Sequence, residues 1–211
     1  TIEPNVGVVE VPDHRIYDLS KLFNPKKTTP AFTRFVDIAG LVAGASKGEG
    51  LGNQFLSHIR ETDAIAHVVR CFEDQNITHV EGNIDPVRDM EVINTELCLA
   101  DLDTVEKKKS KTAKLAQAGI KEAKAILPAL EKVFNALQEG VPARSLHLSD
   151  DEQDVFKELN LITLKPVLYV LNIAESDMSD PMSNDYVKAA VSQAEKENAK
   201  WVPVSAEIEQ E

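Results

Sequence analysis

The stretch FVDIAGLVAGASKGEGLGN, residues 35–53, decides the fold of this chain. It begins with the end of an apolar strand, reaches an acid at Asp37 and enters a loop with five glycines between residues 40 and 52. Glycines at this density favour positive φ angles or a close approach of the backbone to a ligand. In open α/β sheets, ligands bind beyond the carboxyl ends of the strands. The stretch therefore predicts a ligand site, and the alternative is a flexible surface loop.

Composition sets the broad class of the protein. The chain has 211 residues, of which 43% are hydrophobic and 27% are charged, as in ordinary globular proteins. The formal net charge of −12 argues against broad non-specific binding to nucleic acid or anionic lipid, but a local basic patch stays open. No run of about eighteen apolar residues occurs, so we expect no membrane partner. Cys71 and Cys98 lack metal-ligand spacing and indicate reduced core thiols of a cytoplasmic protein, with a disulfide as the alternative.

The order of apolar patterns predicts an α/β fold, with a mostly parallel sheet and helices on both faces. Expected strands are 7–11, 32–36, 64–72, 167–172 and 201–204, and expected helices are 16–23, 51–61, 86–114, 121–139, 149–159 and 185–196. The run AIAHVVRCF, residues 64–72, is nearly continuous and is typical of a parallel strand buried on both faces. The strand at 32–36, the glycine loop, the next helix and the strand at 64–72 together indicate a βαβ unit.

Two long helical patterns, 86–114 and 121–139, predict an inserted helical hairpin. A polar bend containing Gly119 joins them, and Gly140 is expected just beyond the end of the second helix. The basic run KKKSKTAK, residues 107–114, appears polar on all sides. We interpret this run as a solvated tip, with contact to nucleic acid or the ribosome as the alternative.

Three loops that follow strands carry a family resemblance. Residues 37–40 (DIAG), 172–175 (NIAE) and 205–207 (SAE) resemble the switch II, base-recognition and final base-loop motifs of translation-factor-class NTPases. Three longer segments are similar to the bacterial-type YchF / Obg-like ATPase family, in the hydrophobic-substituted branch of P-loop NTPases. These segments are FVDIAGLVAGASKGEGLGNQFL, IRETDAIAHVVRCFED and INTELCLADLDTVEK. The resemblance implies a Ras-like domain with an inserted helical arm that binds and hydrolyses ATP.

The resemblance also implies roles around the phosphates. Thr1 and Asp37 match the switch residues that hold Mg²⁺, and the N–H of Gly40 would face the γ-phosphate. Leu41 stands where Ras-type enzymes carry the water-orienting Gln, so another group must orient water or intrinsic turnover is slow. His79 is a candidate for assisting hydrolysis, and the alternative is a solvated surface residue.

The residue types of the base-recognition loop fit adenine tolerance, and the preference for ATP is what the family resemblance implies. In guanine-specific relatives this loop is Asn-Lys-x-Asp, whose short carboxylate accepts two donors from the guanine edge. Here Asn172 is kept, Ile173 replaces the Lys and Glu175 replaces the Asp, so the added methylene shifts the carboxylate. Ser205 and Ala206 complete the expected nucleotide-binding set. The alternatives are a GTP-specific Obg-type GTPase, or an ordinary turn at the end of a strand.

The expected organisation has three parts. Residues 1–85 form part of a nucleotide-binding domain, residues 86–148 form the helical arm, and residues 149–211 complete the nucleotide-binding domain. The resemblance also implies a P-loop of the form Gly-x-x-x-x-Gly-Lys-Ser/Thr and a C-terminal TGS domain, and neither occurs in these 211 residues. We therefore expect a piece of a longer chain that is inactive by itself, with an unpaired gap between the strands at 32–36 and 64–72.

The resemblance implies a ribosome-associated nucleotide switch in the cytoplasm. ATP and Mg²⁺ are the expected ligands, the ribosome or a ribosomal subunit is the expected partner, and an RNA contact through the arm is the alternative to a solvated tip. Switch loops would order around Mg²⁺ and the γ-phosphate and relax on hydrolysis. The alternative from another class is a non-catalytic interaction fragment that uses only the arm.

Overall fold

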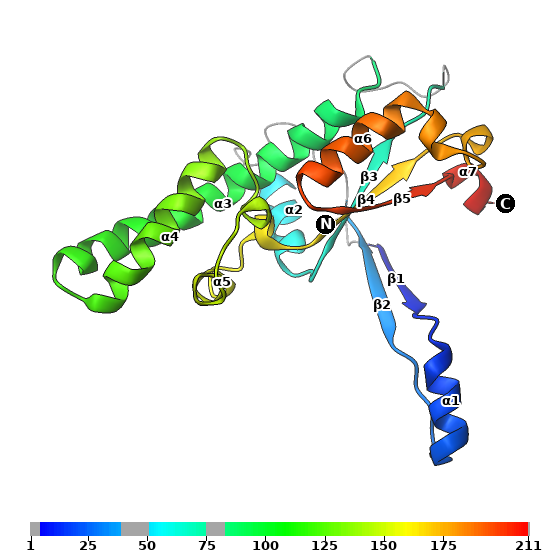
Figure 1. Cartoon of the computed structure of the whole chain (residues 1–211), viewed down its shortest axis with the longest axis horizontal. Coiled ribbons are helices and arrows are strands. Elements are labelled where there is room, and N and C mark those ends of the chain that lie inside the picture. Colours follow the sequence, from blue (N-terminus) through cyan, green and yellow to red (C-terminus); the bar gives the residue numbers. More distant parts are fainter. Residues whose placement is uncertain (1–4, 39–50, 75–82, 211) are drawn as a thin grey trace. The chain divides into compact units, whose positions relative to one another are not determined.

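The computed structural model describes residues 5–38, 51–74 and 83–210 (Figure 1). In the helix that begins at residue 51, side chains are described from residue 55 onward. The chain divides into two compact units, residues 1–40 and 41–211. Among the described residues, no helix has both the length and the apolar character needed to cross a bilayer.

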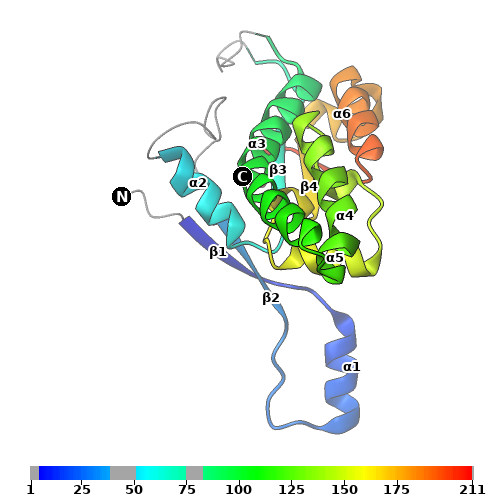
Figure 2. The same ribbon diagram turned by 90° about the vertical axis from the view of Figure 1, so that its left-hand side faces the viewer.

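The first unit is a two-stranded ribbon that carries a short helix. It consists of β1 (Asn5–Glu10), α1 (His14–Phe23) and β2 (Phe32–Asp37). The strands pair antiparallel, with Asn5 opposite Asp37 at one end, and Figure 2 shows α1 beyond the other end of the ribbon. The Asp13 carboxylate caps α1 by accepting the Arg15 N–H at 3.0 Å. The three elements predicted for this part of the sequence are confirmed.

The second unit is built around a parallel sheet with the order β3-β4-β5. Its elements are α2 (Leu51–Arg60), β3 (Ile65–Arg70), α3 (Pro86–Gln117), α4 (Lys121–Gln138), η1 (Ala143–Ser145), α5 (Asp150–Lys157), η2 (Ile162–Leu164), β4 (Val167–Asn172), η3 (Glu175–Asp177), η4 (Pro181–Ser183), α6 (Asp185–Lys196), β5 (Lys200–Val204) and α7 (Ala206–Gln210). In the central strand β4, Asn172 lies opposite both Arg70 and Val204. The carboxyl ends of all three strands therefore meet at one edge.

Strands β2 and β3 belong to different sheets and share no ladder within the described residues. The gap predicted between these two strands stays a prediction, because the strands lie in separate units. The βαβ unit expected around the glycine loop stays a prediction, because most of that loop lies outside the described residues.

One face of the β3-β4-β5 sheet forms the core of the second unit. Val69, Tyr169 and Leu171 point to this face and pack with residues of α3 and α6, including Met90 and Val187. On the opposite face the side chains of Val68, Leu168 and Val202 are 63%, 38% and 36% exposed. The expectation that residues 64–72 are buried on both faces is therefore wrong. A continuous apolar run does not reveal which face another element covers.

The two cysteines lie inside the second unit. Cys71 and Cys98 are both buried and neither forms a disulfide. Burial raises the pKa of each thiol to about 12, so both stay protonated. The prediction of reduced core thiols is confirmed.

Helices α3 and α4 form the predicted antiparallel arm and lie side by side in both views (Figures 1 and 2). Gly119 and Gly140 take left-handed conformations, with φ of 92° and 74°, and follow the ends of the two helices. Val105, Leu130 and Val133 are fully buried between the helices. Because α3 also carries Met90 of the sheet core, one continuous helix of about 48 Å joins the sheet to the arm.

The basic run of the arm is not polar on all sides. Thr112 is buried, and the ammonium of Lys109 lies 3.1 Å from the centre of the Phe134 ring on α4. Lys107 and Lys111 are exposed, as expected of a solvated face. Part of the run therefore stabilises the hairpin, and the rest faces outward.

A buried polar cluster connects the arm to the central strand. The Glu197 carboxylate at the end of α6 accepts hydrogen bonds from the Tyr169 hydroxyl at 2.7 Å and from the Asn94 amide at 2.9 Å. The Arg144 guanidinium, which follows α4, lies 3.1 Å from Glu197 and donates to the Asn94 carbonyl oxygen at 2.7 Å. The cluster thus fixes α3, η1, β4 and α6 to one another at the root of the arm.

His67 lies beside this cluster, with its ring centre 5.4 Å from that of Tyr169. Burial lowers the pKa of His67 from 6.5 to about 4; Glu197 and Asp89 act in the opposite direction and Arg144 in the same one. The unfolded chain takes up a proton near pH 6.5, whereas folded His67 does so only near pH 4.

We therefore expect the free energy of unfolding to fall as the pH drops through this window, by about 3 kcal/mol from this residue. Urea unfolding of the wild type and of His67→Gln at about pH 7 and about pH 4.5 measures the effect. The variant should lose less stability on acidification, and an equal loss in both proteins would contradict the assignment.

Candidate functional site

The two loops predicted to read a base meet at the carboxyl edge of the parallel sheet. The Asn172 side-chain oxygen accepts the Ala206 N–H at 3.1 Å, and the Ile173 N–H donates to the Val204 carbonyl at 2.9 Å. Both contacts follow from the register that sets Asn172 opposite Val204 at the ends of β4 and β5. The structure therefore brings together residues that are 34 positions apart in the sequence.

The other residues of these loops differ in exposure. Ser205 is buried, and its hydroxyl oxygen has no hydrogen-bond partner within the part of the chain that the structure describes. Glu175 is exposed as the first residue of η3, whereas Ile173 is 2% exposed and packs in the sheet core. The residue that replaces the usual Lys of guanine-specific loops thus has a structural role. Glu175 is free to face a ligand.

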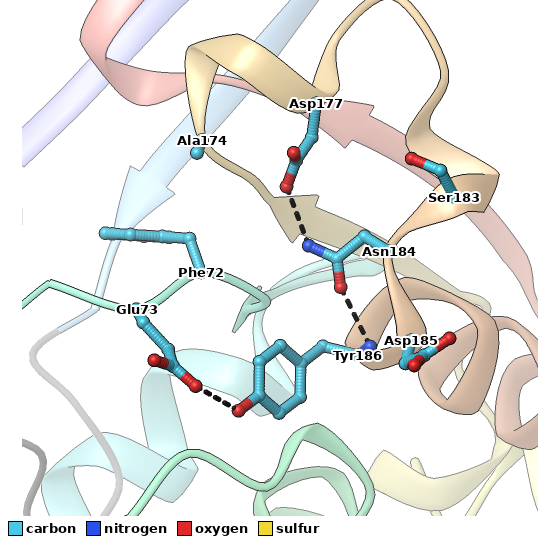
Figure 3. Close-up of a pocket in the computed structure, with 8 residues that line it drawn as sticks. All are labelled: Phe72, Glu73, Ala174, Asp177, Ser183, Asn184, Asp185 and Tyr186. Carbon is cyan, nitrogen blue, oxygen red and sulfur yellow. Dashed lines mark hydrogen bonds between the residues drawn. The ribbon is translucent and has the colours of Figure 1, made fainter.

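A pocket of about 560 Å³ lies at the same edge, and we call it the edge pocket. Its wall comes from the loop after β3, the loop after β4 and the start of α6; the lining residues are Phe72, Glu73, Ala174, Asp177, Ser183, Asn184, Asp185 and Tyr186. Phe72 and Ala174 lie on the same side in Figure 3. The edge pocket therefore joins the predicted base-recognition loop to an aromatic side chain.

Phe72 is a candidate site residue that was not predicted from the sequence. The Arg70 guanidinium lies 4.8 Å from the centre of the Phe72 ring, and its Nε donates to the Phe72 carbonyl at 3.0 Å. These contacts hold an aromatic ring at the edge where parallel strands end, and such rings serve as stacking platforms for bases. An aromatic residue at the carboxyl end of a predicted parallel strand is the signal that could have found it.

The phosphate and metal residues are only partly described. Asp37 ends β2 in the first unit, and its side chain is exposed. Thr1, Gly40, Leu41 and His79 lie outside the described residues. The carboxylate of Asp37 and the hydroxyl of Thr1 are hard oxygen donors that fit Mg²⁺, which takes few protein ligands besides phosphates and water.

Comparisons with known proteins agree with this geometry. Residues 1–99 match the sequence model of the family described as 50S ribosome-binding GTPase. The chain is 52% identical over 211 residues to the "Ribosome-binding ATPase YchF" of Bacillus subtilis and 50% identical over 209 residues to the protein of that name in Escherichia coli. These alignments cover 100% and 99% of the chain, but only 58% and 57% of the relatives.

A solved structure gives the same result. The Schizosaccharomyces pombe YchF GTPase superimposes with a TM-score of 0.79 at 38% identity, over 100% of this chain and 57% of that one. The parallel sheet, its helices and these matches define a domain with the P-loop GTPase fold and an inserted helical arm, which confirms the predicted fold class. Within that class, the chain belongs to the YchF / Obg-like ATPase family.

Proposed function

We propose that this chain is the nucleotide-binding part of a switch protein that binds and hydrolyses ATP and acts on the ribosome. The main support for the proposal is the hydrogen bond from the Ala206 N–H to the Asn172 side-chain oxygen. This bond joins the two predicted base loops near the edge pocket. The relatives named as ribosome-binding ATPases support the same activity and partner. We place the protein in the cytoplasm, where ribosomes and ATP are available.

In this proposal the base binds at the carboxyl edge of the sheet. Phe72 offers a ring for stacking, and Glu175 offers an acceptor for the adenine amino group. Asn172 holds the backbone of the final base loop, so that the Ala206 segment keeps its place when the nucleotide leaves. Recognition of the base thus uses two loops fixed by the sheet and one exposed carboxylate.

The phosphate end of the nucleotide requires the switch residues. Asp37 and Thr1 would hold Mg²⁺, which neutralises charge on the β- and γ-phosphates when bound. The N–H of Gly40 would face the γ-phosphate. Because Leu41 has no polar group, His79 is the candidate for assisting the attacking water. The proposal includes three domain limits: residues 1–85 and 149–211 form the nucleotide-binding domain, and residues 86–148 form the arm.

The length of the carboxylate at position 175 is expected to set the choice between ATP and GTP. Glu175→Asp restores the short side chain of guanine-specific loops, and we expect the ratio of ATP to GTP affinity in the complete protein to fall by about tenfold. Ile173→Lys would be a poorer test, because Ile173 is buried in the core. Titration of each variant with both nucleotides measures the ratio.

The matched control is Glu158→Asp, which shortens an exposed carboxylate at the end of α5. It should leave the ratio of affinities unchanged. An unchanged ratio in Glu175→Asp would show that Glu175 does not read the base, and a wild type that prefers GTP would favour the Obg-type GTPase alternative.

The exposed lysines of the arm are expected to contribute to ribosome binding through RNA. Lys107, Lys111 and Lys114 are exposed on the second half of α3 in a chain of net charge −12. Lysines that neutralise phosphates release counterions, so replacing all three by Gln should weaken binding and reduce its salt dependence by about two to three units of slope.

Co-sedimentation of the complete protein with ribosomes over a range of salt concentrations measures this effect. A triple control variant removes the same number of positive charges at exposed positions outside the arm; its substitutions are Lys157→Gln, Lys196→Gln and Lys200→Gln. Equal salt slopes in the two triple variants would overturn the proposed RNA contact, while leaving the proposed nucleotide site unaffected.

A further inference from the structure

Asn184 joins three elements around the edge pocket through a single amide group (Figure 3). Its side-chain oxygen accepts the backbone N–H groups of Tyr186 at 2.8 Å and Val187 at 3.4 Å, which caps α6. Its nitrogen donates to the Cys71 carbonyl at 3.0 Å and to an Asp177 carboxylate oxygen at 2.7 Å. An amide nitrogen has two hydrogens, so Asn184 has no donor left for a ligand.

The two acceptors of the Asn184 amide belong to the two loops that line the edge pocket. The Cys71 carbonyl precedes Phe72, and Asp177 ends the η3 turn that begins at Glu175. The carbonyl lies 113 residues away from Asn184 in the sequence, so the contact links separate parts of the fold. Asn184 therefore links the Phe72 loop to the Glu175 loop, beyond the backbone bond between the Cys71 N–H and the Asn172 carbonyl at 2.8 Å.

A second bond supports the same wall of the pocket. The Tyr186 hydroxyl, two residues after Asn184, donates to the Glu73 carboxylate at 2.6 Å. It ties the start of α6 to the residue that follows Phe72. The start of α6 thus holds the residues on both sides of Phe72, since Asn184 binds the Cys71 carbonyl and Tyr186 binds Glu73.

We propose that Asn184 is a positioning residue for base recognition, which it controls by fixing the Phe72 loop against the Glu175 loop. This inference rests on the proposed binding of ATP at the edge pocket. Capping alone does not explain an Asn at this position, because Ser or Asp would cap α6 equally well. Only an amide supplies one acceptor for the helix and two donors for the loops.

The variant Asn184→Asp separates positioning from capping. An aspartate keeps the cap and suits the positive end of the helix dipole, so a residue that only caps would tolerate it. It loses both donors, however, and its carboxylate would face that of Asp177. We expect the KM for ATP of the complete protein to rise about tenfold, the kcat to change little, and the preference for ATP over GTP to narrow.

Two further variants complete the test. Tyr186→Phe removes only the bond to Glu73 and should raise the KM for ATP about threefold, even where Asn184→Asp folds poorly. Ser149→Ala removes the cap of α5, where Ser149 and Glu152 form a capping box, and should leave the KM unchanged. This control matches the loss of a helix cap away from the edge pocket.

The outcomes are distinct. A wild type that binds ATP, together with Asn184→Asp and Tyr186→Phe proteins that keep the wild-type KM, would overturn the positioning role and leave the proposed function intact. A wild type that binds no adenine nucleotide would overturn the proposed function, and this inference with it.

Discussion

Replacing Asp37 with Ala is expected to lower the rate of ATP hydrolysis by the complete protein by on the order of 10²–10³-fold, because a metal that stabilises transition-state charge contributes several kcal/mol. The carboxylate is exposed at the end of β2, where the ladder fixes its backbone opposite Asn5. The substitution should therefore leave the ribbon folded while removing a ligand of the proposed Mg²⁺. Steady-state hydrolysis at several Mg²⁺ concentrations measures the loss.

The control for this prediction is Asp18→Ala, which removes an exposed carboxylate of α1 in the same unit. It should hydrolyse ATP at the wild-type rate. If the Asp37 variant retained more than about half of the wild-type rate, with the same Mg²⁺ dependence, the assignment of Asp37 as a metal ligand would be wrong, since such ligands contribute far more than this.

Replacing Glu197 with Ala is expected to lower the free energy of unfolding by about 3–5 kcal/mol, the usual cost of leaving one charge of a buried pair without its partner. The side chains of Arg144 and Glu197 are only 9% and 7% exposed. The substitution also removes the acceptor of the Tyr169 hydroxyl and one acceptor of the Asn94 amide. Urea denaturation of the variant and the wild type gives the difference directly.

Two comparisons make this prediction specific. Asp154→Ala breaks the exposed pair between Asp154 and Lys157 and should cost no more than about 1 kcal/mol. The double variant Arg144→Met, Glu197→Leu removes both charges and should recover most of the lost stability. A Glu197→Ala variant as stable as the Asp154→Ala control would show that the cluster at the arm root does not stabilise the fold.

Local patterns were sufficient to predict most elements of the fold. The helical arm followed from apolar periodicity in residues 86–114 and 121–139, and its end followed from Gly140, whose φ is 74°. The short helix after Ser149 followed from its capping box. Burial was harder to predict, since Val68 and Val69 are alike in sequence but are 63% and 2% exposed. Which face of a strand is covered depends on elements elsewhere in the chain.

The meeting of the two predicted base loops could be expected for the same reason as the sheet, and the role of these loops in reading a base stays a prediction. Asn172 ends one apolar strand and Ala206 follows another, and parallel strands end at one edge. Asn184 carries no comparable local signal, because its role arises from a contact with Cys71, which is distant in the sequence. The predicted roles of Thr1, Asp37, Gly40, Leu41 and His79 stay predictions.

The most direct test of the central claim is calorimetric titration of the complete protein with ATP and with GTP, in the presence and absence of Mg²⁺. We expect ATP to bind at least about tenfold more tightly than GTP, and Mg²⁺ to strengthen binding of ATP. Equal or tighter binding of GTP, or no binding of ATP at all, would contradict the assignment of the edge of this sheet as an adenine-nucleotide site.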